Sequence, residues 1–220
     1  MRLVHLLLDE TGSMFGKHVA TIEGVNQYFD TIAEAPDVRI ALTKFDDRGY
    51  RTLHEGFSKP TDATRLTKEN YTPSGGTNLF DAVAHIIHET ERFVSKLRDL
   101  NNVAQLLDGI GVLIVIYTDG EENSSVKQTV TSINSLIKAK EDQGWTFMYL
   151  GAEKAAWSNS AMFAGTMSGA NVYKSHGDLG TRSVMHAAAA STTAWAAGGL
   201  GETAVIVDDD QKTTVLEHSN

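Results

Sequence analysis

The chain has 220 residues, of which 41% are hydrophobic and 21% charged, and it contains no cysteine. This composition is ordinary for a globular protein with a sizeable core, and the lack of cysteine excludes disulfides, thiolate metal sites and thiol catalysis. The 28 acidic and 19 basic residues give a net charge of −9, which argues against nucleic acid as the main partner because phosphate binding needs a cationic face.

The N-terminal segment carries no targeting signal that we recognise. Its apolar stretch, within residues 1–9, is too short for the hydrophobic region of a signal peptide and is not followed by a small-residue cleavage site. No segment approaches the roughly 20 apolar residues that cross a bilayer. We therefore expect a cytoplasmic protein that does not insert into a membrane.

Short apolar runs alternate along the chain with segments of helical periodicity. The expected strands are Arg2–Leu8, Val38–Phe45, Tyr50–Phe57, Gly111–Thr118, Trp145–Leu150 and Asn171–Lys174. The turn at residues 46–49 is short, so the second and third strands should form an antiparallel hairpin with the third at an edge. Residues 58–74 are polar, and we expect irregular chain there with one helical turn.

The expected helices are recognised by apolar residues that fall on one face. The first helix ends at Pro36, and its apolar face carries Val19, Ile22, Val25, Phe29 and Ile32. The second has an apolar face formed by Leu79, Val83, Ile86, Phe93, Leu97 and Leu100, and the third is capped by Ser124 or Ser125 and carries Val126, Val130, Ile133 and Ile137. A short fourth helix starts near Lys154, and the last is the Ala-rich segment Thr181–Ala197, which ends at Gly198 and Gly199. Such alternation predicts a doubly wound α/β fold in three layers, with a mostly parallel central sheet, one antiparallel edge strand and helices on both faces.

We expect one domain at residues 1–200 and a C-terminal extension at residues 201–220. Within the extension, Thr203–Val207 is typical of a strand and residues 208–210 of a solvated acidic turn. The simpler interpretation is an extra strand or apolar strap on the same domain. The alternative is a segment that pairs with the sheet edge of another subunit and so mediates self-association.

The first candidate site segment directly follows the first strand. The apolar run ends at Asp9, and the hydroxyl side chains of Thr11 and Ser13 follow at alternate positions. Chain that alternates in this way can turn several oxygens toward one point, and such a set suits a hard cation such as Mg²⁺. The alternative is a strand end with a polar turn, in which Asp9 caps the next helix.

Two later loops supply further oxygens. Thr77 lies in a Gly-Gly turn at a helix start, where small residues permit close backbone approach, and Asp119 directly follows the most hydrophobic strand. In open α/β sheets, sites form beyond the carboxyl ends of strands where the strand order reverses. If the first and fourth strands are neighbours there, Asp9 and Asp119 face each other. The candidate metal ligands are Asp9, Thr11, Ser13, Thr77 and Asp119.

These three segments resemble the metal-ion-dependent adhesion site of the von Willebrand factor type A domain family. The family's Asp-x-Ser-x-Ser motif is matched by residues 9–13, with Thr11 in place of the first Ser. Its Gly-Gly-Thr loop is matched by Gly75–Thr77, and its Thr-Asp-Gly motif by Thr118–Gly120. The motifs occur in family order, and the resemblance covers nearly the whole chain.

The resemblance implies a non-enzymatic protein-binding module. Mg²⁺ or Mn²⁺ would be held by Asp9, Thr11, Ser13, Thr77 and Asp119, and an Asp or Glu of a partner protein would complete the shell. A divalent cation with two aspartates is locally neutral, and the hydroxyls leave it electrophilic. Some family members are extracellular adhesins and others act inside cells with AAA+ ATPases. The missing signal peptide favours a single-domain intracellular member of bacterial or phage type, with an AAA+ ATPase or an assembly partner.

Two other functions stay open. One is a structural or assembly subunit whose metal site does not function. The other is a Mg²⁺-dependent phosphotransfer or hydrolytic enzyme, which is disfavoured because no Lys or Arg lies inside the three motifs to stabilise developing charge.

Further acids and histidines lie near the candidate site or on the long helix. Glu10, Glu121 and Glu122 are interpreted either as solvated loop charge or as a rim that favours basic or mixed partner surfaces. His85 and His88, followed by Glu89, have the wrong order for a zinc-protease motif. We expect a histidine pair at or near the helix surface.

Overall fold

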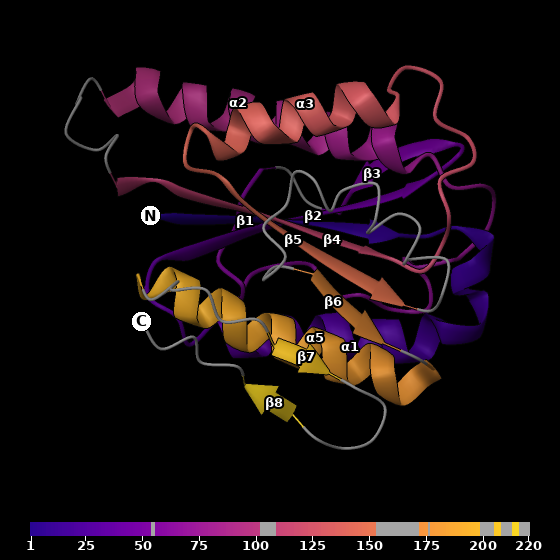
Figure 1. Cartoon of the computed structure of the whole chain (residues 1–220). Coiled ribbons are helices and arrows are strands. Elements are labelled where there is room, and N and C mark those ends of the chain that lie inside the picture. Colours follow the sequence, from indigo (N-terminus) through magenta and orange to yellow (C-terminus); the bar gives the residue numbers. More distant parts are fainter. Residues whose placement is uncertain are drawn as a thin grey trace.

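The computed structural model describes residues 1–53, 56–101, 109–152, 172–175, 177–198, 205–207 and 213–215. Its centre is a six-stranded sheet in the order β3-β2-β1-β4-β5-β6 (Figure 1). The strands are β1 (Arg2–Asp9), β2 (Val38–Asp46), β3 (Gly49–Thr52), β4 (Gly111–Thr118), β5 (Thr146–Ala152) and β6 (Val172–Ser175). All neighbouring strands pair in parallel except β2 and β3, which form an antiparallel hairpin. This is the predicted fold class.

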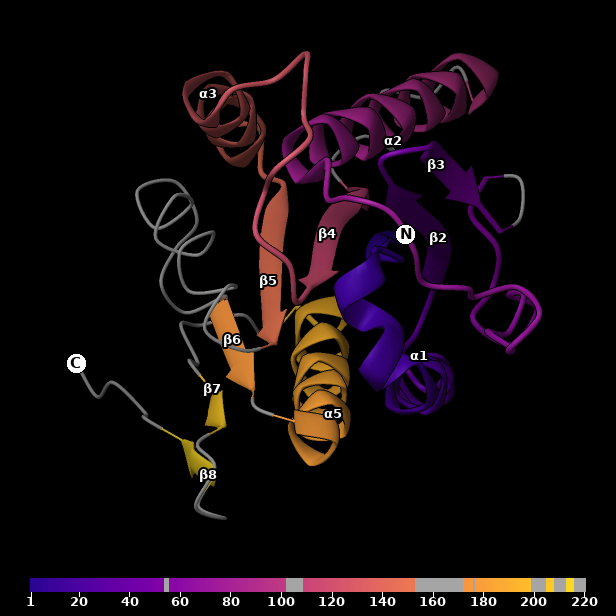
Figure 2. The same ribbon diagram turned by 90° about the vertical axis from the view of Figure 1, so that its right-hand side faces the viewer.

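Helices cover both faces of the sheet and make the expected three layers. The α-helices are α1 (His18–Ile32), α2 (Leu79–Asn101), α3 (Val130–Glu141) and α5 (Gly177–Ala196), and a 3₁₀ helix η1 (Gly12–Lys17) precedes α1. Figure 2 shows α1 and α5 on one face and α2 and α3 on the other. None of the helices in the described part of the chain is both long and apolar enough to span a membrane.

The central strand β1 separates two hydrophobic cores. Val4, Leu6 and Leu8 belong to the core shared with α1 and α5, whereas Leu3 and Leu7 belong to the core shared with α2 and α3. Successive side chains of a strand point to opposite faces, so an uninterrupted apolar run is what a strand covered on both sides requires. The carboxyl end of β1 is thereby fixed in the middle of the sheet.

One predicted strand boundary and one predicted buried residue are wrong, whereas the helical turn expected in residues 58–74 is present. The third strand ends at Thr52 instead of Phe57, and Gly56 has a φ of +69°, which breaks an extended run; Ser58 then forms an isolated bridge with Ile40. Val19, expected on the buried face of the first helix, is 42% exposed. In residues 58–74 the expected helical turn is a single turn, closed by Tyr71 N–H donating to Thr67 O at 3.0 Å.

The start of α3 also differs from the prediction. Its N-cap is Thr129, whose side chain accepts a hydrogen bond from Ser132 N–H in a capping box, and neither Ser124 nor Ser125 caps it. Val126 lies before the helix and is 87% exposed. The cause is Asp81 on α2, whose carboxylate accepts the backbone N–H groups of residues 126–128. These bonds hold the segment in a non-helical conformation.

Several predicted features lie outside the described residues. These are the helix expected from about Lys154, Gly199 at the end of the last helix, and the acidic turn at residues 208–210. In the extension, β7 (Val205–Val207) is a strand as predicted, but it pairs antiparallel with β8 (Thr213–Val215) in a separate two-stranded sheet. Strand β7 contacts β6 and α5 of the same chain.

Candidate metal site

The loops that carry the candidate ligands meet at the carboxyl edge of the central sheet. Strand β1 pairs with β4 on one side and β2 on the other, so the strand order reverses at β1. The loops after β1 and β4 therefore diverge from neighbouring strand ends, where sites form in open α/β sheets. The prediction that Asp9 and Asp119 face each other required β1 and β4 to be neighbours, and they are.

Four of the five candidate ligands form one chain of polar contacts. Asp9 Oδ1 accepts the backbone N–H of Thr11 at 2.7 Å, and Thr11 Oγ1 lies 3.1 Å from Ser13 Oγ. The Ser13 hydroxyl donates to Asp119 Oδ1 at 2.6 Å. Asp9, Thr11 and Asp119 are all at most 4% exposed, so both carboxylates are withdrawn from water.

Thr77 joins this group through its position over Gly120. A Cβ atom built on Gly120 would lie 2.8 Å from Thr77 Oγ1, 3.3 Å from Ser13 Oγ and 3.5 Å from Asp9 Oδ2. Oxygens from the first two loops therefore converge around one point next to Gly120 of the third loop, which has no side chain to fill it. Two carboxylates and three hydroxyls make an all-oxygen set, which fits Mg²⁺ or Mn²⁺.

Hydrogen bonds between backbone groups hold the three loops together. Gly12 N–H donates to Gly75 O at 3.0 Å, and the N–H groups of Asn123 and Ser124 donate to Thr77 O at 3.0 and 3.1 Å. Gly75 has a φ of +80°, and a side chain there would also collide with the carboxylate of Asp47. The Gly-Gly turn is therefore required by the backbone itself.

The Asp9 carboxyl is buried beneath the loop. Its Oδ2 accepts the hydroxyl of Thr118 at 2.5 Å, and the hydroxyl of Tyr71 donates to the backbone carbonyl of Asp9 at 2.7 Å. Burial raises the pKa of Asp9 to about 6, against the opposing hydrogen bonds of Thr118 and Thr11, and the negative charge of Asp119 raises it further. A cation beside Asp9 would relieve this desolvation of the charged form.

Lys17 is a second polar group in contact with Asp119, and the sequence analysis missed it. Its ammonium donates to Asp119 Oδ2 at 2.6 Å, with side-chain exposures of 10% for Lys17 and 1% for Asp119. We counted only cations inside the three motifs, whereas Lys17 comes four residues after Ser13. A helical turn brings residues at that spacing to the same side, so the spacing was the available signal.

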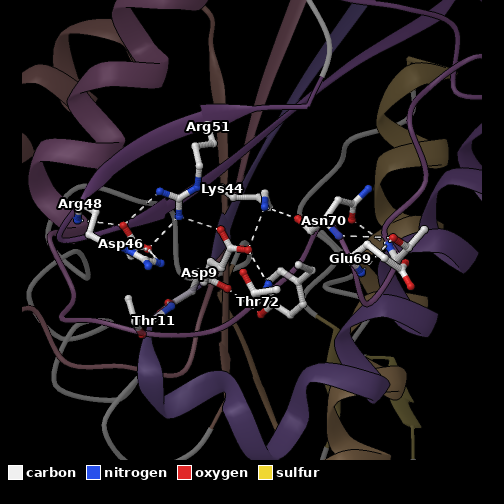
Figure 3. A network of polar contacts seen from close by, with 12 residues as sticks. Asp9, Thr11, Lys44, Asp46, Arg48, Arg51, Glu69, Asn70 and Thr72 are labelled. Carbon is white, nitrogen blue, oxygen red and sulfur yellow. Dashed lines mark hydrogen bonds and ion pairs between the residues drawn. The ribbon is translucent and has the colours of Figure 1, made fainter.

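Glu10 is neither solvated loop charge nor part of an exposed rim. It is 1% exposed, and its carboxylate accepts Lys44 Nζ at 2.8 Å, Arg51 Nη2 at 2.7 Å and the backbone N–H of Thr72 at 2.7 Å (Figure 3). Lys44 also donates to Asn70 O. Glu10 therefore ties the end of β1 to β2, β3 and the segment that leads into the Gly-Gly turn.

Glu121 and Glu122 lie in different surroundings. Glu121 is exposed. Glu122 accepts the backbone N–H of Phe80 at 2.9 Å and that of Ser125 at 2.7 Å. The N–H of Phe80 lies in the first turn of α2, where backbone donors have no acceptor within the helix, and Glu122 supplies one. The rim interpretation is thus left with Glu121 alone. On α2, His85 faces Glu89 at 3.5 Å and His88 faces Glu91 at 3.6 Å, a histidine pair at the helix surface as expected.

Comparison with known proteins supports the fold through structure alone. No family model and no curated protein sequence matches the chain. Solved structures do: the pilus adhesin SpaC of Lactobacillus rhamnosus GG aligns with a TM-score of 0.62 at 15% identity, over 87% of this chain and 30% of that one. A von Willebrand factor type A structure from Catenulispora acidiphila aligns with a TM-score of 0.56 at 13% identity, over 87% and 42% of the two chains.

A third match is aligned over most of the length of both chains. The vWF domain of the type V pili tip protein Mfa5 from Porphyromonas gingivalis has a TM-score of 0.57 at 10% identity, and the alignment covers 86% of this chain and 94% of that one. This chain spans less than half of the SpaC and Catenulispora chains. Together with the sheet order and the layers, these alignments identify the chain as having the von Willebrand factor type A fold.

Proposed function

We propose that the chain is a metal-dependent protein-binding module. Mg²⁺ or Mn²⁺ is held by Asp9, Thr11, Ser13, Thr77 and Asp119, and an Asp or Glu side chain of a partner protein completes its coordination. The observation that carries this proposal is the convergence of oxygens of Thr77, Ser13 and Asp9 within 3.5 Å of one point beside Gly120. The metal supplies a Lewis-acidic position that a carboxylate can occupy.

Each ligand has a distinct role in this proposal. Asp9 and Asp119 supply the negative charge, and the three hydroxyls supply neutral oxygens that leave the cation able to attract a further anion. The contact of Ser13 with Asp119 at 2.6 Å preorganises two of the ligands. The similarity in fold to a pilus adhesin and to the vWF domain of a pili tip protein supports a binding role.

The proposal is tested with peptides, because the partner is not identified. A displayed random peptide library is selected on the full chain in Mg²⁺ and eluted with chelator, and the enriched peptides are synthesised with each Asp or Glu replaced by its amide. We expect peptides whose binding needs both Mg²⁺ and one carboxylate, and no binding to folded Asp9→Ala or Thr77→Ala variants. Peptides that bind equally well in chelator, or as their amides, would overturn the proposal.

The enzymatic alternative gains one group from Lys17, since an ammonium can stabilise a transferring phosphoryl group. That ammonium is bound to Asp119 at 2.6 Å, and one cation beside the site does not by itself indicate turnover, so we keep the binding function as the conclusion. Turnover of a panel of phosphoesters in Mg²⁺ that is lost in Asp119→Ala would favour the enzyme instead.

The setting of the module is part of the proposal. We expect a cytoplasmic protein whose partner is an AAA+ ATPase or an assembly partner, and a cell-surface setting like that of a pilus adhesin is the alternative. Fractionation of cells that express the native gene, probed with an antibody to this chain, separates the two settings.

A further inference from the structure

The carboxylate of Asp119 is neutralised by the chain itself. Lys17 Nζ donates to Oδ2 at 2.6 Å, and Ser13 donates to Oδ1 at 2.6 Å. Both members of the ion pair are nearly excluded from solvent, with side-chain exposures of 10% and 1%. A buried carboxylate without a paired charge is strongly unfavourable, so the pairing with Lys17 stabilises the arrangement seen here.

The charges explain why this pairing matters for a divalent cation. Asp9, Asp119 and Lys17 carry −2 and +1, so a divalent cation that enters beside all three produces a net +1 in a poorly solvated site. Without Lys17 the same cation would give neutrality. Repulsion between an ammonium and a dication is strong where water is excluded. In addition, the ammonium occupies one of the two oxygens that Asp119 offers.

We propose that Lys17 is a built-in counter-ion of the metal-free site, which neutralises Asp119 until a divalent cation displaces it and thereby lowers the affinity for that cation. This inference rests on the proposed metal-dependent function. Lys17 then sets the range of divalent-cation concentration over which the site becomes occupied. Cation binding and release of the Lys17 ammonium from Asp119 are then one coupled event.

The test compares four forms of the full chain by calorimetric titration with MgCl₂ after chelator treatment. These are the parent, Lys17→Met, Lys17→Arg and the control Lys140→Met. Lys140 is also buried, at 5% exposure, and its Nζ donates to Glu91 Oε1 at 2.6 Å on the α2–α3 side of the sheet. The control therefore removes the ammonium of another buried lysine, whose partner Glu91 is 47% exposed. If Lys17→Met does not fold, Lys17→Gln supplies a neutral polar replacement.

We expect Lys17→Met to bind Mg²⁺ about tenfold more tightly than the parent, while Lys17→Arg and Lys140→Met keep the parent's affinity. We also expect the thermal midpoint of metal-free Lys17→Met to lie below that of the parent, and saturating Mg²⁺ to close this gap because tighter binding stabilises the variant more. A purely structural role for Lys17 would lower the midpoint without tightening the Mg²⁺ affinity.

Other outcomes separate this inference from the function on which it rests. Equal or weaker Mg²⁺ binding by Lys17→Met, with normal binding by the parent, overturns the counter-ion role and leaves the metal-dependent function standing. Binding by Lys17→Met alone supports the counter-ion role and overturns metal dependence in the native chain. Failure of every form to bind overturns both.

Discussion

Arg51 donates to the buried carboxylate of Glu10 at 2.7 Å, and this ion pair links the short edge strand β3 to the residue that follows Asp9. Arg51 also donates to Asp46 at 2.8 Å, so one guanidinium bridges two carboxylates that are 1% and 0% exposed (Figure 3). The network lies directly beside the candidate metal site. It joins the residue that directly follows Asp9 to β2 and β3.

Replacing Glu10 with Gln should destabilise the protein strongly. The variant leaves the ammonium of Lys44, which is 5% exposed, without its carboxylate, and a broken buried ion pair typically costs about 3–5 kcal/mol. Urea unfolding followed by circular dichroism measures the loss. Glu34→Gln is the control, because Glu34 is exposed and should change the unfolding free energy by less than about 0.5 kcal/mol. Equal effects of the two variants would contradict a structural role for Glu10.

Asp46 should contribute stability that depends on pH. Burial acts to raise the pKa of its carboxyl, but the hydrogen bonds from Arg48 and Arg51 outweigh burial and hold the pKa below the ordinary 3.8. A depressed pKa stabilises the folded state above the unfolded value and loses that effect as pH falls through the folded value. The parent should therefore be more stable than Asp46→Asn at neutral pH, with the gap closing below about pH 4. A gap that stays constant down to pH 2 would exclude this linkage.

Gly120→Ala should weaken Mg²⁺ binding while the fold remains. The added methyl group would lie 2.8 Å from Thr77 Oγ1 and would enter the point on which the loop oxygens converge. We expect affinity to fall by about 10- to 100-fold, as when ligand positioning is disturbed at other metal sites. Gly16→Ala is the matched control in the neighbouring η1, because a Cβ there meets nothing within 4 Å. The proposed site would be misplaced if both variants bound Mg²⁺ like the parent.

The fold was largely predictable because its strongest signals are local. The mostly apolar runs of β1 and β4 predicted central buried strands, and the short turn at residues 46–49 predicted the edge hairpin. The start of α3 was not predictable in this way. It depends on the Asp81 carboxylate, which lies 45 residues before Val126, the first of the backbone groups that it binds.

In the candidate site, too, the residues marked by local sequence patterns were predicted and those that depend on distant contacts were not. The motifs pointed to Asp9 and Asp119, because each lies at the end of a strand visible in the sequence, and to Thr77, because it lies in a Gly-Gly turn at a helix start. The contact of Lys17 with Asp119 spans 102 positions, and the spacing from Ser13 to Lys17 was the only local signal for it. The burial of Glu10 was missed for a similar reason, since its partners come from β2, β3 and the loop before Thr77.

Removal of residues 202–220 should leave the domain and its metal site intact. The six-stranded sheet is complete before β7, which pairs only with β8 among the described strands. We expect the shortened chain to unfold in one cooperative transition, to bind Mg²⁺ with the parent's affinity and to keep the parent's number of subunits in solution by light scattering. A smaller assembly after truncation would instead assign self-association to the extension.

Calorimetric titration of Mg²⁺ into the chelator-treated chain, with Asp9→Asn alongside, tests the central claim most directly. Asn keeps the size of the Asp9 side chain and removes its charge, and circular dichroism verifies that both forms are folded. The metal-dependent function predicts binding at one site in the parent and its loss in Asp9→Asn. Absence of binding in both forms, or equal binding in both, would contradict it and would favour a structural role for the domain.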